Sequence, residues 1–213
     1  LLMSSRDNSP ASSSTPDNRT TQSNIEPLNP ARLSEVDGVF LCTPHGKASS
    51  LAKAALAAGK VVVDLSADFR LRDPQLFADT YGDAHAAPEL LKHAVYGLTE
   101  HHRSEVACAT LVANPGCYPT SILLPLLPLR SNDLIDLTAP LIADSKSGVS
   151  GAGKQPSERT HFGNGSHRHA PEIAQELGHA IVFTPHLLPT FRGILSTIYV
   201  TPTAGTNAEA MRS

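Results

Sequence analysis

A cysteine at the head of an apolar segment is the residue best placed to do chemistry. Cys117 follows Pro115 and Gly116 in the stretch NPGCYPT, and an apolar run from Ile122 to Leu129 comes after it. Because proline and glycine favour a tight turn, we expect Cys117 in the first turn of a helix, where unpaired N–H groups and the helix dipole stabilise a thiolate. The same N–H groups could hold an oxyanion formed on a carbonyl that the sulfur attacks. The alternative is a buried structural cysteine at a helix start.

The two other cysteines lie in apolar runs that we predict to be strands. Cys42 ends the run VFLC, and Cys108 lies in ACATLVAN. Buried thiols in strands are inert. We therefore predict that Cys117 is the most reactive of the three thiols.

A thiolate nucleophile works with an acid–base partner, and the histidines are the candidates. The chain has 10 of them, so most must be incidental. In HRHAPEI, His169 stands three residues before Glu172, across the start of a helix that Pro171 begins. The carboxylate can then lie beside the imidazole and set its tautomer. The alternative is a polar loop of solvated histidines. No metal site is predicted, because the HRH spacing does not fit a helical pair of ligands and the cysteines are not clustered.

Three further segments are typical of ligand-binding loops. SKSGVSGAGK, residues 145–154, is rich in glycine and serine and could bring backbone N–H groups close to a phosphate or a nicotinamide ring. It lacks the Walker spacing, which argues against an ATPase. TPHG follows a strand at the position where open α/β sheets bind ligands. Arg70 in SADFRL is similarly placed and could pair with a phosphate or carboxylate, with a surface salt bridge as the alternative.

Composition limits the class of protein. The chain has 213 residues, of which 40% are hydrophobic and 17% charged, with a net charge of -3. This mild acidity gives no case for nucleic acid or an anionic membrane as partner. Pro125 and Pro128 interrupt the longest apolar stretch, so we predict no membrane span. Three distant cysteines do not indicate a disulfide framework, and we expect a cytoplasmic protein.

The elements that must position these residues fall into two groups. Residues 4–30 are rich in Ser, Asn, Thr and Pro and predict a long surface loop. Residues 39–42 and VVVDLSADF predict buried strands on either side of the helix KASSLAKAALAAGK, which Gly59 ends. A strand, a helix and a strand in this order predict a parallel sheet with a right-handed crossover. ACATLVAN predicts a further strand that leads into the cysteine turn.

The pattern changes after the cysteine. CYPTSILLPLLPL predicts an apolar helix bent at Pro125, and LTAPLIAD predicts a strand that leads into the glycine-rich loop. HAIVFTPHLLPT and GILSTIYVTP alternate as strands of an antiparallel sheet do. We predict an α/β plus α+β protein with a boundary near residue 114: a nucleotide-binding type α/β domain before it and an α+β domain after it.

Seven stretches occur in an order that is specific as a set, although each alone is a weak signal. They are LCTPHG, DLSADFRL, YGLTE, NPGCYPT, SKSGVSGAGK, HRHAPEI and TPHLLPTFRGILSTIYV. Over nearly its whole length the chain resembles the N-acetyl-γ-glutamyl-phosphate reductase family, which is similar in architecture to aspartate-semialdehyde dehydrogenase. The resemblance implies NADPH-dependent reduction of an acyl phosphate to a semialdehyde, through a cysteine thioacyl intermediate, in arginine biosynthesis. It also implies a homodimer or homotetramer. The two domains implied are a partial Rossmann-like NADP-binding domain over residues 1–113 and a truncated catalytic and dimerisation domain over 114–213.

The resemblance further implies roles for single residues. Cys117 matches the nucleophile, and His169 with Glu172 matches the acid–base pair. Ser5 and Arg6 match the positions that recognise the adenosine 2′-phosphate, which selects NADP over NAD. The other positions implied for cofactor binding are Pro44, His45, Gly46, Ser147, Gly148, Ser150 and Gly151. The positions implied for substrate binding are Arg70 and Asn114.

The chain also departs from the family pattern. A first strand with a G-x-x-G-x-x-G loop is expected before Leu1, and a C-terminal return to the cofactor domain is expected after TNAEAMRS, which reads as the opening turn of a helix. We therefore expect a fragment that binds NADP poorly and does not complete the reduction. Three alternatives stay open: a carrier-protein-linked aminoadipyl-phosphate reductase of lysine biosynthesis, a Cys-His hydrolase or acyltransferase without a dinucleotide, and a binding module whose catalytic residues never assemble.

Overall fold

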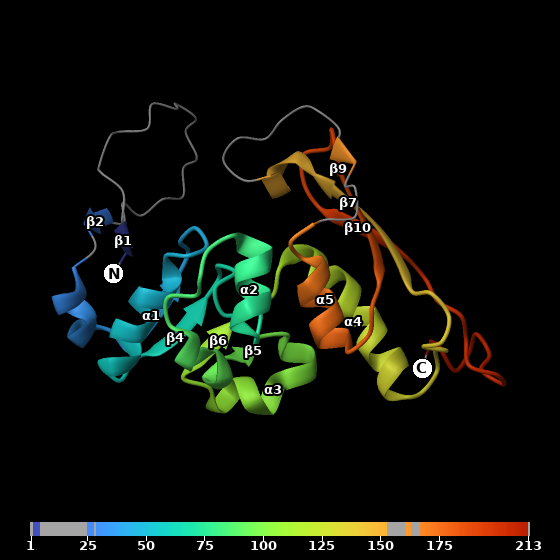
Figure 1. Ribbon diagram of the computed structural model, residues 1–213, viewed down its shortest axis with the longest axis horizontal. Coiled ribbons are helices and arrows are strands. Elements are labelled where there is room, and N and C mark those ends of the chain that lie inside the picture. The colour runs from blue at the N-terminus through green and yellow to red at the C-terminus, as the bar shows by residue number, and fades with distance from the viewer. Residues whose placement is uncertain (1, 5–24, 28, 153–160, 163–166, 213) are drawn as a thin grey trace, which may run out of the picture.

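The computed structural model describes residues 2–4, 25–27, 29–152, 161–162 and 167–212. Figure 1 shows two parts side by side, with the N-terminal part in blue to green and the C-terminal part in yellow to red. A short parallel pair, β1 (Leu2–Ser4) and β2 (Ile25–Pro27), forms a sheet of its own. The expectation of a loop over residues 4–30 is therefore wrong at Ser4 and in β2, and residues 5–24 and 28 lie outside the described residues.

The predicted strand–helix–strand unit is confirmed. It consists of β3 (Gly38–Leu41), α1 (Ala48–Ala57) and β4 (Val61–Asp64), and the two strands pair in parallel. Gly59 ends the helix as predicted: its φ of 71° is left-handed, and the N–H groups of Gly59 and Lys60 donate to the carbonyls of Leu56 and Ala55. These two bonds pair carbonyls that the helix end leaves without partners.

The parallel sheet has the strand order β3-β4-β6-β5, with β5 at Val95–Tyr96 and β6 at Leu111–Ala113. Further elements connect these strands: α2 (Pro74–Tyr81), α3 (Thr99–Cys108), and the 3₁₀ segments η1 (Pro30–Glu35) and η2 (Pro88–His93). None of these connecting elements was predicted. Helix α3 buries no residue and so carries no apolar periodicity, and β5 has only two residues.

Both expectations about the other cysteines are wrong. Strand β3 ends at Leu41, so Cys42 lies just beyond it and is exposed. Cys108 is the last residue of helix α3 and is also exposed, because β6 begins only at Leu111. Exposure therefore does not distinguish Cys117 from the other two thiols.

Over its described residues, the second part contains two α-helices and a mixed sheet. The helices are α4 (Cys117–Ser131), which contains Pro125 and Pro128, and α5 (Ala170–Leu177). The strands are β7 (Ile142–Gly148), β8 (His161–Phe162), β9 (Val182–Leu188) and β10 (Ile194–Tyr199), in the order β10-β7-β9-β8. The expectation of an antiparallel sheet is wrong for its central pair, because β7 and β9 run parallel. Helix α5 lies on the connection between them, as a parallel crossover requires.

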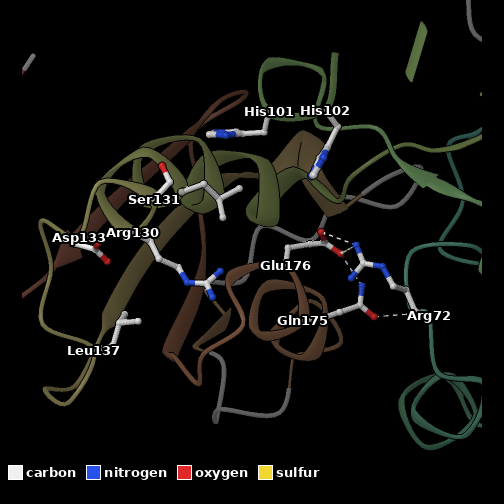
Figure 2. Close-up of a pocket in the computed structure, with 10 residues that line it drawn as sticks. Arg72, His101, His102, Arg130, Ser131, Asp133, Leu137, Gln175 and Glu176 are labelled. Atoms are coloured by element: carbon white, nitrogen blue, oxygen red, sulfur yellow. Dashed lines mark hydrogen bonds and ion pairs between the residues drawn. The ribbon is translucent and has the colours of Figure 1, made fainter. Parts of the chain in front are cut away.

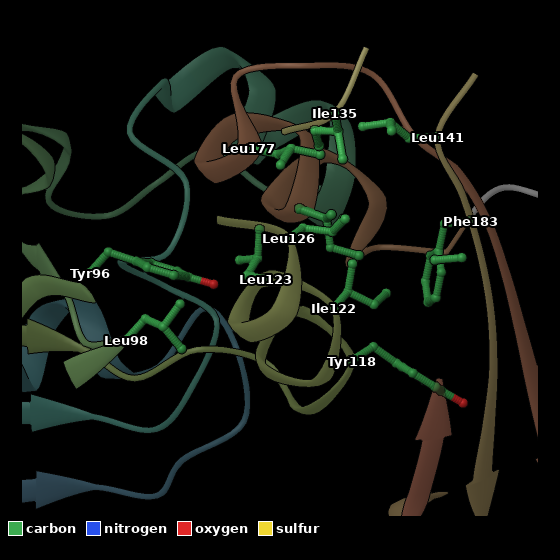
Figure 3. Packing of buried hydrophobic residues seen from close by; sticks show 12 residues of the cluster. Tyr96, Leu98, Tyr118, Ile122, Leu123, Leu126, Ile135, Leu141, Leu177 and Phe183 are labelled. Carbon is green, nitrogen blue, oxygen red and sulfur yellow. The ribbon is translucent and has the colours of Figure 1, made fainter. Parts of the chain in front are cut away.

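Helix α4 joins the two parts through one apolar core (Figure 3). Tyr96 and Leu98 come from the β5 region, and they pack with α4 and α5 in a cluster of fully or largely buried side chains. The members contributed by these two helices are Tyr118, Ile122, Leu123, Leu126, Ile173 and Leu177. The start of α4 is consequently held from both sides. A domain boundary near residue 114 stays a prediction.

Candidate active site

Cys117 occupies the position that the sequence predicts, the first residue of helix α4. Strand β6 ends at Ala113, and the N–H of Asn114 still donates to the carbonyl of Asp64 at 2.8 Å. Gly116 is the N-cap, with extended backbone (ψ 157°), and its carbonyl accepts the first helical bond from Thr120 at 2.9 Å. The thiol is exposed. A strand, a three-residue turn and a helix thus place an accessible sulfur at a helix N-terminus, where a thiolate is stabilised.

His169 lies against the turn that carries Cys117. A Cβ atom built on Gly116 would lie 2.8 Å from His169 Nε2 and 2.9 Å from Cε1. The imidazole is buried, and burial lowers the pKa of His169 to about 3, with nearby His167, Arg70 and Arg168 acting in the same direction. At neutral pH the ring is therefore uncharged, which is the form that accepts a proton.

Glu172 does not make the predicted contact with His169. Its Oε1 accepts hydrogen bonds from the Tyr96 hydroxyl at 2.7 Å and from the Gly116 N–H at 2.8 Å. Within the described residues, Glu172 Oε2 and His169 Nδ1 are both buried without a hydrogen-bond partner. Burial raises the pKa of Glu172, and Arg70, whose Nη1 lies 3.8 Å from Oε2, opposes that shift. The carboxylate thus holds the cysteine turn instead of setting the tautomer of the imidazole.

Arg70 is buried, so the surface salt bridge considered for it is wrong. Its Nε donates to the carbonyl of Asn114 at 2.8 Å, and its Nη2 donates to the carbonyl of Leu65 at 2.9 Å. The carboxylate near it is Glu172 of the same chain. Asn114 is exposed beside the cysteine turn, and its Nδ2 donates to the carbonyl of Pro115 at 3.1 Å. Substrate binding by Arg70 and Asn114 stays a prediction.

The TPHG loop lies between β3 and α1, where Pro44, His45 and Gly46 are exposed. Gly46 has a left-handed φ of 76°, and its N–H donates to Asp68 Oδ1 at 2.5 Å. The N–H and hydroxyl of Ser49 donate to Asp68 Oδ2 at 2.9 and 2.7 Å. A buried carboxylate of the chain itself therefore takes the donors at the start of α1. The loop has the position expected of a ligand site, but these N–H groups are already paired.

The glycine-rich segment is not an open loop over its described residues. Strand β7 continues through Ser147 to Gly148, and the 3₁₀ segment η3 (Val149–Ala152) follows it. The N–H groups of residues 148, 149 and 150 donate to the carbonyls of residues 193, 190 and 191 at 2.8–3.0 Å. Ser150 and Gly151 are exposed in η3. The 190–193 turn therefore pairs the N–H groups of residues 148–150, and cofactor binding by this segment stays a prediction. Ser5 and Arg6 lie outside the described residues.

The sequence did not single out three side chains around the thiol. Tyr96 binds Glu172, as described above. His167 accepts the N–H of His169 at its Nδ1 at 3.1 Å, and its ring centroid lies 4.7 Å from that of His169. Tyr118 packs edge-on against His167 and donates to the carbonyl of His186 at 2.9 Å. The HRH and GCY spacings place His167 and Tyr118 beside the expected catalytic residues, but no local signal connects Tyr96 to Glu172.

A hollow of about 640 Å³ lies apart from this site, between α3, the end of α4 and α5 (Figure 2). Its lining combines Arg72 and Arg130 with Asp133 and Glu176. Arg72 forms an ion pair with Glu176 at 2.9 Å, so its charge is already neutralised. We place the chemistry at the thiol and imidazole, which this hollow does not include.

Two other kinds of site are absent from the part of the chain that the structure describes. It contains no group of three or more His, Cys, Asp or Glu side chains arranged to hold a metal ion. No helix within the described ranges is both long and apolar enough to cross a membrane.

Comparisons with known proteins identify related domains over both parts. A family model described as semialdehyde dehydrogenase, NAD binding domain, matches residues 1–109, and one described as semialdehyde dehydrogenase, dimerisation domain, matches residues 117–213. N-acetyl-gamma-glutamyl-phosphate reductases from Magnetococcus marinus and Pelotomaculum thermopropionicum are 48% and 47% identical over 88% and 90% of the chain. The aligned chain spans 58% and 60% of those two proteins.

Solved structures of lower identity share the fold. Aspartate semialdehyde dehydrogenase II from Vibrio cholerae matches with a TM-score of 0.64 and 17% identity, covering 91% of this chain and 64% of that one. The Candida albicans aspartate semialdehyde dehydrogenase structure with NADP matches with a TM-score of 0.60 and 13% identity, covering 96% and 62%. The predicted combination of a parallel-sheet domain with a second, sheet-containing domain is confirmed.

Proposed function

The chain belongs to the semialdehyde dehydrogenase family. We propose that its activity is that of an N-acetyl-γ-glutamyl-phosphate reductase that uses NADPH in arginine biosynthesis. The observation that carries the proposal is the thiol of Cys117 at the start of α4, with the neutral imidazole of His169 packed on the preceding residue. The names of the two relatives at 47–48% identity support the substrate class.

The proposed first step is transfer of the acyl group to the sulfur. His169 accepts the proton of the Cys117 thiol, and the thiolate attacks the acyl carbon of the acyl phosphate. The new S–C bond forms, the bond between that carbon and the phosphate oxygen breaks, and inorganic phosphate leaves with the electron pair. N–H groups at the start of α4 would stabilise the oxyanion that develops on the carbonyl. The product is a thioester on Cys117, and His169 holds the proton that the later steps return.

The described residues make only part of a site for NADP. The TPHG loop lies at the carboxyl end of a parallel strand, as a dinucleotide site requires. The N–H groups of Gly46 and residues 148–150 are paired within the chain, and Ser5 and Arg6 lie outside the described residues. A bound nicotinamide would supply the reduction itself.

The proposal is tested with the 213-residue chain and N-acetyl-γ-glutamyl phosphate, without a dinucleotide. We expect a single burst of phosphate, at most one per chain, and an acyl adduct on the peptide that contains Cys117 by mass spectrometry. Cys117→Ser is expected to remove both signals, and Cys108→Ser is the matched control that keeps them. Continuous phosphate release would indicate a Cys-His hydrolase instead, and no adduct at all would contradict the proposed nucleophile.

We further propose that a second copy of the chain binds the outer face of the mixed sheet. The strand register brings Tyr199, Ile142 and Val182 into one row across β10, β7 and β9, and these side chains are 56%, 37% and 55% exposed. Leu195 lies four residues before Tyr199, on the same face of β10, and is 65% exposed. Exposed apolar side chains gathered on one face are typical of an interface. The dimerisation-domain match over residues 117–213 supports this occupant.

A further inference from the structure

One oxygen atom of Glu172 accepts hydrogen bonds from two distant parts of the chain. The Tyr96 hydroxyl reaches Oε1 from the end of β5 in the parallel sheet, and the Gly116 N–H reaches it from the turn before Cys117. Glu172 itself projects from α5 and is fully buried. A carboxylate that is out of water holds its orientation only through such donors, since each unmet bond costs free energy in a dry site.

The residue that this carboxylate holds is the N-cap of the helix that begins with Cys117. Three contacts fix the turn: Arg70 Nε donates to the Asn114 carbonyl, Glu172 accepts the Gly116 N–H, and the His169 ring packs on Gly116. The direction of the Gly116 peptide plane sets where the next residue, Cys117, points. A change in the position of Glu172 therefore moves the sulfur relative to His169.

The ring and the hydroxyl of Tyr96 have separable roles. The ring packs in the apolar cluster with Leu98 and α4, and Figure 3 shows its hydroxyl directed away from β5 toward the helices. Burial raises the pKa of Tyr96, which keeps the hydroxyl protonated as a donor. The Tyr96 hydrogen bond also lowers the pKa of Glu172 against the larger effect of burial. Removal of the hydroxyl alone leaves the packing and weakens the hold on Glu172.

We propose that Tyr96 is a positioning residue for the nucleophile, acting through the Glu172 carboxylate on the Gly116 N–H. The inference rests on the proposed function only for the role of Cys117 as nucleophile. The Tyr96 hydroxyl donates to Glu172, and through that carboxylate it determines where the thiol lies. A purely structural tyrosine would contribute to stability without any effect that passes through Glu172.

The test compares Tyr96→Phe with Tyr81→Phe in the 213-residue chain. Tyr81 is the matched control, because its hydroxyl is buried and has no hydrogen-bond partner within the described residues. Two rates are measured: hydrogen exchange of the Gly116 amide by NMR, and alkylation of Cys117 by iodoacetamide, followed on its peptide. In Tyr96→Phe we expect amide exchange about tenfold faster, the effect of losing a hydrogen bond to a charged group, and alkylation at least about threefold slower, since the thiol loses its placement. Tyr81→Phe is expected to change neither rate.

The Glu172→Gln background tests whether the effect passes through the carboxylate. If Tyr96 acts through Glu172, the two substitutions are not additive, and Tyr96→Phe changes both rates less in Glu172→Gln than in the wild type. Full additivity, or Tyr96→Phe rates within twofold of wild type, would overturn the inference. Should Tyr96→Phe not fold, Glu172→Gln alone must speed Gly116 exchange, and an unchanged rate overturns the inference. If wild-type Cys117 is alkylated no faster than Cys108, the proposed nucleophile fails, whereas the Gly116 exchange still reports on the Tyr96–Glu172 contact separately.

Discussion

The imidazole of His169 packs against the backbone of Gly116, so that a methyl group added there would lie 2.8 Å from Nε2. Gly116 has φ -65°, an ordinary value, so its backbone conformation does not require glycine. The close approach of the ring is what excludes a side chain. The residue before the thiol is therefore a glycine because the base lies on top of it.

Gly116→Ala is expected to displace His169 and slow the alkylation of Cys117. The added methyl group also meets Pro119 Cδ at 3.0 Å, so neither neighbour accommodates it without movement. Overpacking of this kind costs about 1–3 kcal/mol, and we expect the free energy of unfolding to fall by that amount. Urea unfolding and peptide-level alkylation measure the two effects.

The control for this prediction is Gly38→Ala. A Cβ on Gly38 would lie 3.4 Å from the carbonyl oxygen of Val61, an ordinary contact, and the site is distant in sequence from Cys117. Equal loss of alkylation in both variants would mean that the effect comes from general destabilisation and not from His169.

Cys117 is expected to react with iodoacetamide faster than Cys42 and Cys108, although all three thiols are exposed. Cys117 is the first residue of α4, where the helix dipole stabilises a thiolate, and Cys108 is the last residue of α3, where the dipole opposes one. Limited alkylation followed by peptide mass spectrometry gives the three rates. Similar rates for Cys117 and Cys108 would show that the helix position has no effect.

The sequence predicts the local elements that carry the nucleophile well. Proline and glycine before an apolar run are enough to place Cys117 at a helix start, and the strand–helix–strand unit from Gly38 to Asp64 follows from apolar periodicity and from Gly59. Both signals are local. A helix or strand can be predicted from the sequence when its own residues bury one face and its ends carry capping residues.

The contacts of Glu172 could not be predicted in the same way. Its spacing from His169 suggested a local pair, but its partners lie 56 and 76 residues away at Gly116 and Tyr96. The N–H groups of residues 148–150 are likewise paired by a turn some 40 residues later. A local pattern shows which groups are polar, whereas the tertiary fold decides which of them meet. Glu172 is buried beside the turn before α4, where it binds Gly116 and Tyr96 and not the nearby His169.

His169→Asn is expected to slow acylation of Cys117 by acyl phosphate about 10²–10⁴-fold, the usual effect of losing a general base. The uncharged imidazole next to the cysteine turn is the group that takes the thiol proton in the proposed step. Rapid-quench measurement of phosphate release gives the rate. A loss below tenfold at every pH would move the role to His167, whose ring lies 4.7 Å away, or to His161.

Substitution on the outer face of the mixed sheet is expected to weaken self-association. Leu195→Glu and Tyr199→Glu each place a carboxylate in the proposed interface, where it would lose its water. Sedimentation equilibrium should show a dimer for the wild type and mainly monomer for these variants. Phe40→Ser is the control, because Phe40 is 72% exposed on β3 of the other sheet. A wild-type monomer at all concentrations would contradict the proposal.

The buried imidazole also predicts how stability depends on pH. Burial lowers the pKa of His169 to about 3 in the folded chain, from its ordinary value of 6.5. Between these values the unfolded chain binds a proton that the folded chain cannot, so the free energy of unfolding falls as the pH drops, by up to about 1.4 kcal/mol per pH unit. The contribution of Asp64 to this pH dependence has the opposite sign. Burial raises its pKa to about 6 from 3.8, so the folded chain takes up the proton first and is stabilised as the pH falls.

His169→Asn separates the two effects. The variant loses the histidine contribution and keeps that of Asp64, so its stability between pH 6 and 4 should fall less steeply than that of the wild type, or rise. Urea unfolding at each pH measures the difference between the two curves, which should grow steadily as the pH falls below about 6.5. His179→Asn is the control, since His179 is partly exposed and its Nδ1 donates to the Ala180 carbonyl at 2.7 Å. Parallel curves for the wild type and His169→Asn would mean that the imidazole is protonated as readily in the folded chain as in the unfolded one. It would then not be the neutral base that the proposed acylation step requires.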